Sequence, residues 1–365
     1  MKVLHVISGD LWAGAEAQAC TLLASLQKEP GVEVAAALLN EGELARRLRS
    51  HGIPVSLFSE RQTGPVRIVC GLRKLIREWQ PDVVHTHRFK ENILGCVANL
   101  LSRNVPSVRT VHGACEHAAG GIGKRTLRYL DVFCGRHLQQ RIIAVSLDLA
   151  EKLAHDFPVD KIAVIENGVD VEAVRAQLTP VAFRTNEPTA THVGIVGRLV
   201  PVKRVDLFLD VARTLVARDP ARQWRFHVFG DGPLRASLVA RANAQDRVTF
   251  HGHRDDSIAC IAGLDVLVMC SDHEGLPMTL LEALAVGTRL VAHGVGGIPA
   301  VIGSRHDCAI VDQHDAEGYA TAILKLLASA GGVRQPLSEG AVFTARNNAQ
   351  RIGHLYRELA SGRAA

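Results

Sequence analysis

The chain has 365 residues, more than one ordinary hydrophobic core organises, so its length predicts two domains. Hydrophobic residues make up 47% and charged residues 22%, and the apolar residues fall in short runs, which excludes a membrane-spanning helix of about 20 residues. A net charge of +5 is compatible with an anionic substrate or an acidic membrane surface, but it excludes the strongly basic surface of a nucleic-acid-binding protein.

The amino terminus, MKVLHVIS, carries one Lys before a short apolar run, which is typical of a strand and not of a signal peptide. We therefore expect a cytoplasmic protein. Eight scattered cysteines form no CxxC pair, which predicts reduced thiols and neither disulfides nor zinc. They are Cys20, Cys70, Cys96, Cys115, Cys134, Cys260, Cys270 and Cys308.

Short β-branched runs alternate with segments of helical period along the first half of the chain, which predicts a parallel α/β sheet. The predicted strands cover residues 2–8, 32–39, 54–58, 82–87, 105–113, 141–146 and 161–168. The predicted helices start at residue 15 and lie around 43–50, 67–79, 92–101, 127–138 and 146–157.

Residues 171–191 lose this rhythm and contain two prolines, as an interdomain linker would. The alternation then restarts with predicted strands at 192–197, 224–230, 247–252, 265–270, 289–294 and 308–312. We expect an α/β protein with two facing Rossmann-like, doubly wound domains at residues 1–170 and 171–340. A last helix, within residues 341–365, has no strand after it and is expected to cross back and pack on the first domain.

The segment DHEGLPMTLLEALAVG is the most informative, because it follows a strand, where open α/β sheets bind ligands. A helix that opens at Pro277 leaves the backbone N–H groups of Met278 and Thr279 free, and its dipole attracts phosphate. Glu282 lies among apolar residues, where a carboxylate needs donors such as ribose hydroxyls. The alternative is that Glu274 and Glu282 are solvated surface residues.

Two cations open the helix after the strand 192–197, where the helix dipole disfavours them. Lys203 and Arg204, with Arg198 at the end of the strand, therefore predict an anionic partner such as a diphosphate. Solvated loop cations are the alternative reading.

In the first domain, the turn SGDLWAGAEAQ brings backbone amides near Gly14 within reach of a phosphate, although its spacing is not GxGxxG and argues against a dehydrogenase. His85, His87 and His112 stand at strand ends, where a role in the cleft competes with a purely structural one. No HExxH or Cys/His pattern indicates a metal site.

Taken in order, these segments closely resemble the GT-B-fold retaining glycosyltransferases with the Glu-x7-Glu signature, known as glycosyltransferase family 4. The resemblance spans nearly the whole chain. The matching pieces are AGAE, HTH, TVHG, AVS, ENGVD, GRLVPVK, FGDGP, VTFHG, EGLPMTLLEA and GVGGIP. Two departures are AGAE in place of GGAE and Ala300 where an acidic residue is common, which leaves the preferred sugar open.

The resemblance implies an acceptor-side first domain and a second domain that binds a UDP- or GDP-sugar donor. Arg198 and Lys203 would bind the diphosphate, and Glu274 and His112 the transferred sugar, and these four would be the catalytic residues. Further implied donor contacts are Gly14, His253, Arg254, Leu276, Met278, Thr279 and Glu282, with His87 and Arg88 on the acceptor side.

The implied reaction moves a hexose to a saccharide or lipid-linked saccharide with retention of configuration, in surface polysaccharide or glycolipid synthesis. No Asp-x-Asp motif is present, so no metal or other cofactor is expected, and the two cations would take the place of the metal. A sugar-nucleotide epimerase, a sugar phosphorylase and a catalytically silent sugar-nucleotide-binding protein are the alternatives.

The segment 120–141 carries Lys124, Arg125, Arg128 and Arg136 together with Leu127, Leu130 and Phe133. This pattern fits an amphipathic helix on an anionic membrane, at the inner face of which the enzyme would then work. It equally fits an ordinary helix with its apolar side in the core.

Overall fold

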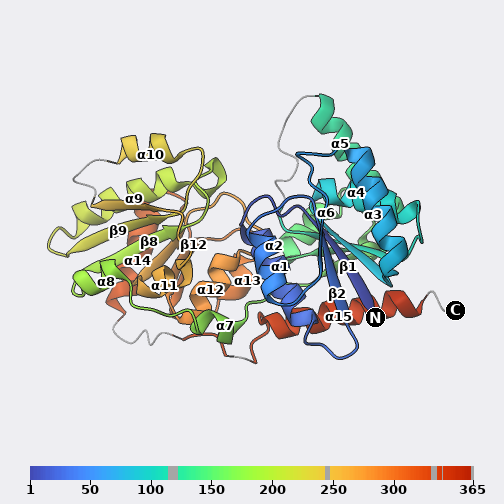
Figure 1. Ribbon diagram of the computed structural model, residues 1–365. Helices are drawn as coiled ribbons and strands as arrows, with labels where there is room; N and C mark the ends of the chain where they lie inside the picture. Colours follow the sequence, from blue (N-terminus) through green and yellow to red (C-terminus); the bar gives the residue numbers. More distant parts are fainter. Residues whose placement is uncertain (114–121, 243–246, 330–334, 339, 363–365) are drawn as a thin grey trace. The chain divides into compact units, whose positions relative to one another are not determined.

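The computed structural model describes residues 1–113, 122–242, 247–329, 335–338 and 340–362, without the side chains of Ile122 and Lys124. It divides into two compact units: unit 1 comprises residues 1–168 and 342–365, and unit 2 comprises residues 169–341. Both are parallel α/β sheets with helices around them, as Figure 1 shows, so the predicted α/β, doubly wound fold class is confirmed.

The sheet of unit 1 has the strand order β3-β2-β1-β4-β5-β6-β7, with every pair parallel. Its strands are β1 (Lys2–Ile7), β2 (Glu33–Leu38), β3 (Val55–Leu57), β4 (Val83–His87), β5 (Ser107–Val111), β6 (Arg141–Ala144) and β7 (Ile162–Val164). Its helices are α1 (Gly14–Leu26), α2 (Glu43–Ser50), α3 (Pro65–Trp79), α4 (Phe89–Leu100), α5 (Ile122–His137), α6 (Leu147–Leu153) and α15 (Ala345–Ser361).

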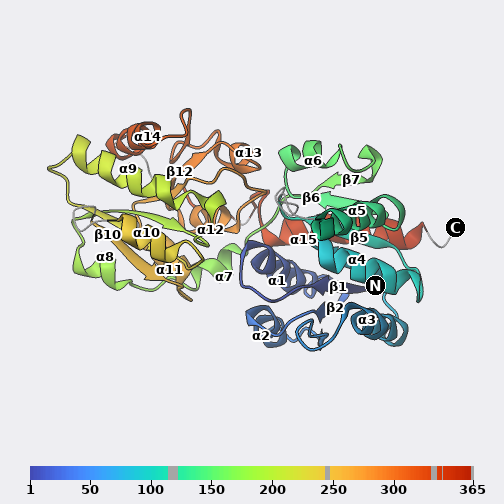
Figure 2. The same ribbon diagram turned by 90° about the horizontal axis from the view of Figure 1, so that it is seen from above.

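One apolar core of unit 1 joins the sheet to α1, α2 and α15, and another joins its opposite face to α3 and α4. The last helix, α15, therefore belongs to unit 1, and Figure 2 shows it beside the strands and helices of that unit. Its Tyr356 is fully buried. Arg351 ties this helix to β7 through the Glu166 carboxylate and, at 2.7 Å, the Val164 carbonyl.

The sheet of unit 2 has the order β10-β9-β8-β11-β12-β13 and is also parallel. Its strands are β8 (Thr191–Val196), β9 (Trp224–Phe229), β10 (Val248–Gly252), β11 (Val266–Met269), β12 (Arg289–His293) and β13 (Cys308–Val311). Its helices are α7 (Val171–Arg175), α8 (Ala182–Asn186), α9 (Val205–Arg218), α10 (Arg235–Arg241), α11 (Ser257–Gly263), α12 (Met278–Val286), α13 (Ile298–Ile302) and α14 (Ala316–Ala328).

The stretch 171–191, which we expected to be a linker, instead forms α7 and α8 and packs within unit 2. Arg175 of α7 donates to the carbonyl groups of Ala285 and Leu337, and Asp170 caps the same helix. The sequence misled because both helices are only five residues long, too short for a periodic pattern.

The sequence also led us to expect reduced cysteines and no membrane-spanning helix. The seven described cysteines are all free thiols, and Cys115 lies outside the described residues. Among the described residues, no helix is long and apolar enough to cross a membrane.

Candidate functional site

The strand order of each unit places its ligand-binding edge. In a doubly wound sheet, ligands bind beyond the carboxyl ends of the two strands between which the order reverses. In unit 2 these strands are β8 and β11, which are followed by the loops that carry Arg198 and Lys203 and, on the other side, Glu274. In unit 1 they are β1 and β4: Gly14 begins the helix after β1, and His87 is the last residue of β4.

Lys203 and Glu274 form an ion pair in unit 2. The Lys203 ammonium lies 2.5 Å from a Glu274 carboxylate oxygen, and the two side chains are 27% and 11% exposed. Lys203 ends a single 3-10 turn, and Glu274 follows β11 across the switch point. Sequence reasoning expected both to bind a donor but did not foresee that they pair.

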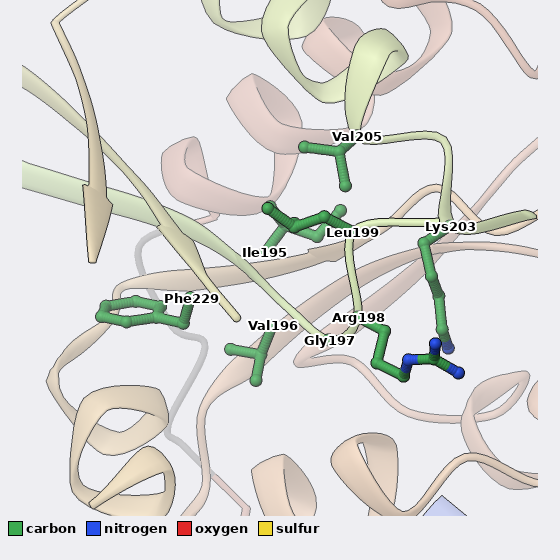
Figure 3. A pocket seen from close by; sticks show the side chains of 8 residues that line it. All are labelled: Ile195, Val196, Gly197, Arg198, Leu199, Lys203, Val205 and Phe229. Atoms are coloured by element: carbon green, nitrogen blue, oxygen red, sulfur yellow. The ribbon is translucent and has the colours of Figure 1, made fainter. Parts of the chain in front are cut away.

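Arg198 and Lys203 line one small hollow, whose other lining residues are Ile195 and Val196 of β8, Phe229 of β9, and Gly197, Leu199 and Val205. Figure 3 shows both cationic side chains extending from the loop after β8, away from the apolar residues. Arg198 is exposed and makes no ion pair with any described residue. The two cations beside this hollow suit an anionic group such as a diphosphate.

The helix α12 begins at Met278, with Pro277 as its N-cap residue and no side-chain cap. The first backbone bond of this helix runs from Leu281 to Pro277, so the preceding N–H groups, of Met278 to Leu280, have no described partner. Leu276 and Met278 are buried, and Thr279 is half-buried. They therefore offer this site mainly backbone donors, where an anion is favoured.

Glu282, one turn into α12, is only half-buried, while its neighbours Leu281 and Ala283 are fully buried. The loop of Glu274 is held by the GVGG turn, where Gly297 donates to the Gly275 carbonyl at 2.6 Å.

The remaining predicted basic side chains each lie close to a carboxylate. Arg204 bonds to Asp206 and, at 3.2 Å, to Asp272, so these carboxylates and not a ligand compensate it. Arg254 is paired with Asp256 at 2.6 Å. His253 is 62% exposed and lies 3.4 Å from an Asp255 oxygen.

In unit 1, Gly14 is the exposed first residue of α1, and no atom lies within 4 Å of a Cβ placed there. Glu16, two residues later, is fully buried and lies 2.7 Å from the Arg88 guanidinium. Burial raises the pKa of Glu16, against the effects of Arg88 and of backbone donors that include Ala13. Arg88 itself follows β4 with a φ of 51°, a left-handed conformation that this ion pair helps to hold.

Four histidines lie in a row on one face of the unit 1 sheet. His85 and His87 stand two residues apart on β4 and therefore share a face, and His5 stands opposite His85 on β1. His5 bonds to His87 at 3.1 Å, and His87 bonds to His112 at 3.0 Å. The hydroxyl of Tyr356, from α15, contacts His85 and, at 3.4 Å, His5.

Burial lowers the pKa of each of these histidines, to about 3 for His87 and well below the usual value for His5, His85 and His112. The four rings are therefore neutral at physiological pH. His112 is half-buried, and its Nδ1 atom is buried without a hydrogen-bond partner among the described residues.

Both nitrogens of His87 are occupied, and the ring is 1% exposed, so it has no nitrogen left for a direct acceptor contact. Sequence reasoning missed His5, Glu16 and Tyr356. For His5 a signal existed, since a polar residue in the centre of an apolar strand calls for a buried partner.

Within the described ranges, the one group of three side chains close enough to consider for a metal ion is His5, His85 and His87, whose candidate ligand atoms lie within 4.8 Å of one another. All three are buried, and each of their ring nitrogens already has a hydrogen-bond partner. A metal ion there would have to break these bonds.

Comparisons with known proteins bear on both units. Residues 190–329 match a family described as glycosyl transferases group 1, and residues 12–173 match glycosyltransferase family 4. Together the matches span most of the chain.

Among curated proteins, the chain is 27% identical over 72% of its length to an Escherichia coli UDP-Gal:alpha-D-GlcNAc-diphosphoundecaprenol alpha-1,3-galactosyltransferase, of which 70% is covered. It is 26% identical over 76% of its length to a Corynebacterium efficiens D-inositol 3-phosphate glycosyltransferase, of which 71% is covered. Among solved structures, Anabaena HepE in complex with UDP-glucose superposes with a TM-score of 0.77 at 19% identity, over 100% of this chain and 99% of HepE.

Proposed function

The chain belongs to glycosyltransferase family 4, among the glycosyl transferases of group 1, and we propose that it transfers a hexose from a nucleotide diphosphate sugar with retention of configuration. One observation carries this proposal: the pair Lys203–Glu274, the free cation Arg198 and the uncapped start of α12 all follow β8 and β11, where the strand order reverses. A diphosphate needs this combination of cations and backbone donors, and a sugar needs the carboxylate.

In this proposal, Arg198, Lys203 and the first N–H groups of α12 bind the diphosphate and stabilise the charge that grows on it as the sugar leaves. Lys203 also neutralises Glu274, which otherwise would repel the phosphates at close range. Glu274 then accepts hydrogen bonds from sugar hydroxyls, and Glu282 accepts them from the ribose. The attacking hydroxyl approaches from the face that the phosphate leaves, so no covalent intermediate is needed.

We propose a UDP-sugar ahead of a GDP-sugar as donor, because the Escherichia coli relative is named for UDP-Gal and HepE was crystallised with UDP-glucose. His253 and Arg254, at the end of β10, are proposed to flank the base, with Gly14 near the phosphates and His112 at the sugar. The acceptor is proposed to be a saccharide or a lipid-linked saccharide, the second by analogy with the same Escherichia coli enzyme.

The donor site is tested by thermal unfolding in the presence of UDP, GDP, ADP and their common sugar conjugates. A ligand at one hundred times its dissociation constant stabilises the folded state by about 2.7 kcal/mol, which raises the midpoint by several degrees. We expect the largest shift with UDP compounds and its loss in Lys203→Ala and Glu282→Ala. A chain that no nucleotide stabilises is not a sugar-nucleotide enzyme of this kind.

Transfer itself is tested with radiolabelled UDP-sugars and a saccharide or undecaprenyl-diphosphate-linked acceptor. The anomeric configuration of the product, read by NMR coupling constants, decides between retention and inversion. Sugar interconversion without acceptor would favour an epimerase, and nucleotide binding without turnover a silent binding protein.

The helix α5 supports a second proposal, a peripheral contact with an anionic membrane. Leu127, Leu130, Phe133 and Tyr129 are between 39% and 72% exposed, so the apolar side of this helix is not in the core. Exposed Arg125, Arg128 and Arg136 stand on the same helix, and Lys124 lies outside the described side chains. Apolar side chains flanked by arginines suit an interfacial helix.

Liposome flotation tests this contact with vesicles that contain or lack anionic lipid. We expect binding to the anionic vesicles only, and loss of binding in a Tyr129→Ser/Phe133→Ser variant. Equal recovery in the unbound fraction with both vesicle types would contradict it.

A further inference from the structure

An unbroken chain of hydrogen bonds runs through unit 1 and ends at His112. It starts at the Thr110 hydroxyl, 2.8 Å from His85 Nε2, and passes from His85 Nδ1 to the Tyr356 hydroxyl. From Tyr356 it continues to His5 Nε2, then from His5 Nδ1 to His87 Nε2, and from His87 Nδ1 to His112 Nε2. All members except His112 are at most 1% exposed.

Each neutral imidazole has one N–H donor and one bare nitrogen acceptor, so a ring that accepts on one side must donate on the other. The Tyr356 hydroxyl has a single hydrogen, and the two rings are its only hydrogen-bond partners in the described chain. That buried hydrogen is satisfied only when the hydroxyl accepts from one ring and donates to the other. The direction of the first bond therefore sets the direction of every later one, up to the tautomer of His112.

The Thr110 hydroxyl decides between the two directions. Its only hydrogen-bond partner in the described part of the chain is His85 Nε2. If Thr110 donates, its hydrogen is satisfied, and every ring downstream carries its proton on Nδ1. If the direction reverses, the buried Thr110 hydrogen has no described acceptor, and an unmet buried donor destabilises the folded state.

We propose that His5, His87 and Tyr356 are positioning residues that transmit this polarity and present His112 to the donor sugar as an Nδ1–H hydrogen-bond donor. The series of hydrogen bonds ends at the buried Nδ1 of His112, to which no described residue forms a hydrogen bond, and a protonated Nδ1 there needs an acceptor atom. A sugar oxygen supplies it. The identity of that acceptor rests on the proposed function. The direction of the hydrogen bonds does not depend on it.

Unit 2 contains a built-in control with the opposite polarity. His192 Nε2 lies 2.9 Å from the Glu187 carbonyl, which accepts only, so His192 must carry its proton on Nε2. His192 Nδ1 then accepts from His227 Nε2 at 2.9 Å, and His227 Nδ1 accepts from His251 Nε2 at 2.9 Å. These three rings are all Nε2–H tautomers.

The test is a long-range proton–nitrogen NMR spectrum of protein labelled in the histidine ring nitrogens, because the chemical shift of each nitrogen reports whether it is protonated. We expect protonated Nδ1 in His5, His85, His87 and His112, and protonated Nε2 in His192, His227 and His251. Protonated Nε2 in His87 or His112 would overturn the proposal. The wild-type protein suffices for this measurement.

Two substitutions then test transmission. His87→Leu removes both bonds, so His112 is expected to show a mixture of tautomers and kcat/KM for donor transfer to fall roughly tenfold. In His87→Gln, the amide oxygen accepts from His5 and the amide nitrogen donates to His112, so the single Nδ1–H tautomer and activity within about twofold of wild type are expected. A His112 tautomer that stays single in His87→Leu would contradict transmission.

The NMR spectrum tests the inference about tautomers, and the transfer assay tests the proposed function, so one can fail without the other. Expected tautomers without transfer would reject the proposed function and leave the chain of bonds intact. Transfer by a protein whose His112 carries its proton on Nε2 would reject the inference and leave the function.

Discussion

At the residue scale, the candidate donor site contains a carboxylate, that of Glu274, whose negative charge must be compensated. Glu274 is 11% exposed, and a carboxylate so placed depends on the Lys203 ammonium for compensation. Removing the lysine therefore has two effects: it removes a cation from the diphosphate site, and it leaves an unpaired carboxylate where the diphosphate must bind. Arg204, the adjacent residue, shows the opposite case, a cation already satisfied by Asp206 and Asp272.

We expect Lys203→Ala to lower kcat/KM for donor transfer by about 100- to 1000-fold, the usual loss for a single group that stabilises developing negative charge. Steady-state kinetics and calorimetric titration with UDP measure it. Lys74→Ala is the matched control, because Lys74 is 75% exposed in a helical pair with Glu78. Equal activity of both variants would remove Lys203 from the site.

A second residue-scale prediction concerns metals. The proposed site neutralises the diphosphate with Arg198, Lys203 and backbone N–H groups, so transfer is expected to continue at its full rate in EDTA. Assays after dialysis against chelator, with and without added Mg²⁺ or Mn²⁺, measure this dependence. A rate that falls with EDTA and returns with Mg²⁺ would contradict the assigned role of the two cations.

At the element scale, the loops after β8 and β11 are shaped by close backbone contacts that only glycine permits. Gly230, after β9, has a φ of +128°, and a Cβ there would lie 1.9 Å from the Gly197 carbonyl oxygen beside Arg198. Gly296 has a φ of +61°, and a Cβ there would lie 2.2 Å from the Glu274 carbonyl oxygen. The position of each loop therefore depends on a neighbouring loop.

We expect Gly230→Ala to displace the turn that carries Arg198, to lower the free energy of unfolding by more than 2 kcal/mol and to abolish the UDP-induced thermal shift. Gly31→Ala separates strain from overlap, because Gly31 has a φ of +73° with no atom within 4 Å of the added carbon. That control should cost only about 1 kcal/mol and keep the shift. Equal losses in urea unfolding would mean that backbone strain alone matters.

At the scale of the whole molecule, each unit buries a row of hydrogen-bonded histidines on one face of its sheet. Burial lowers the pKa of His87 and of His227 to about 3, and it lowers the pKa values of the other members of both rows. The unfolded chain titrates near 6.5 instead. Between these values the unfolded state binds protons that the folded state does not.

Stability is therefore expected to be full above about pH 6.5 and to fall as the pH drops below it, by up to about 1.4 kcal/mol per pH unit for each buried ring. Urea unfolding at pH 7.5, 6.5 and 5.5 measures this slope, and this range lies above the titration of ordinary carboxylates. His87→Gln should flatten the slope by about one proton, whereas His354→Gln, at a ring that is 72% exposed, should leave it unchanged. A midpoint independent of pH in this range would contradict the neutral, buried state of these rings.

Much of the fold was predictable from the sequence, because it depends on local patterns. Alternating apolar strands and amphipathic helices predicted two parallel α/β sheets, and the helix without a following strand predicted a crossing back to the first domain, as α15 makes. Five-residue helices such as α7 and α8 carry too few turns to reveal a period, so the stretch 171–191 was misread as a linker.

For the candidate site, the sequence by itself determined which residue types stand at which strand ends: Arg198, Lys203, Glu274 and the start of α12 were all found from their motifs. Only the tertiary structure decided which of them meet. Lys203 pairs with Glu274, 71 residues away, Arg204 bonds to Asp272, 68 residues away, and His85 bonds to Tyr356 across 271 residues. Spacing along a chain fixes the face of a strand or a helix, but the partner across that face depends on the order in which the strands assemble, and no local pattern encodes it.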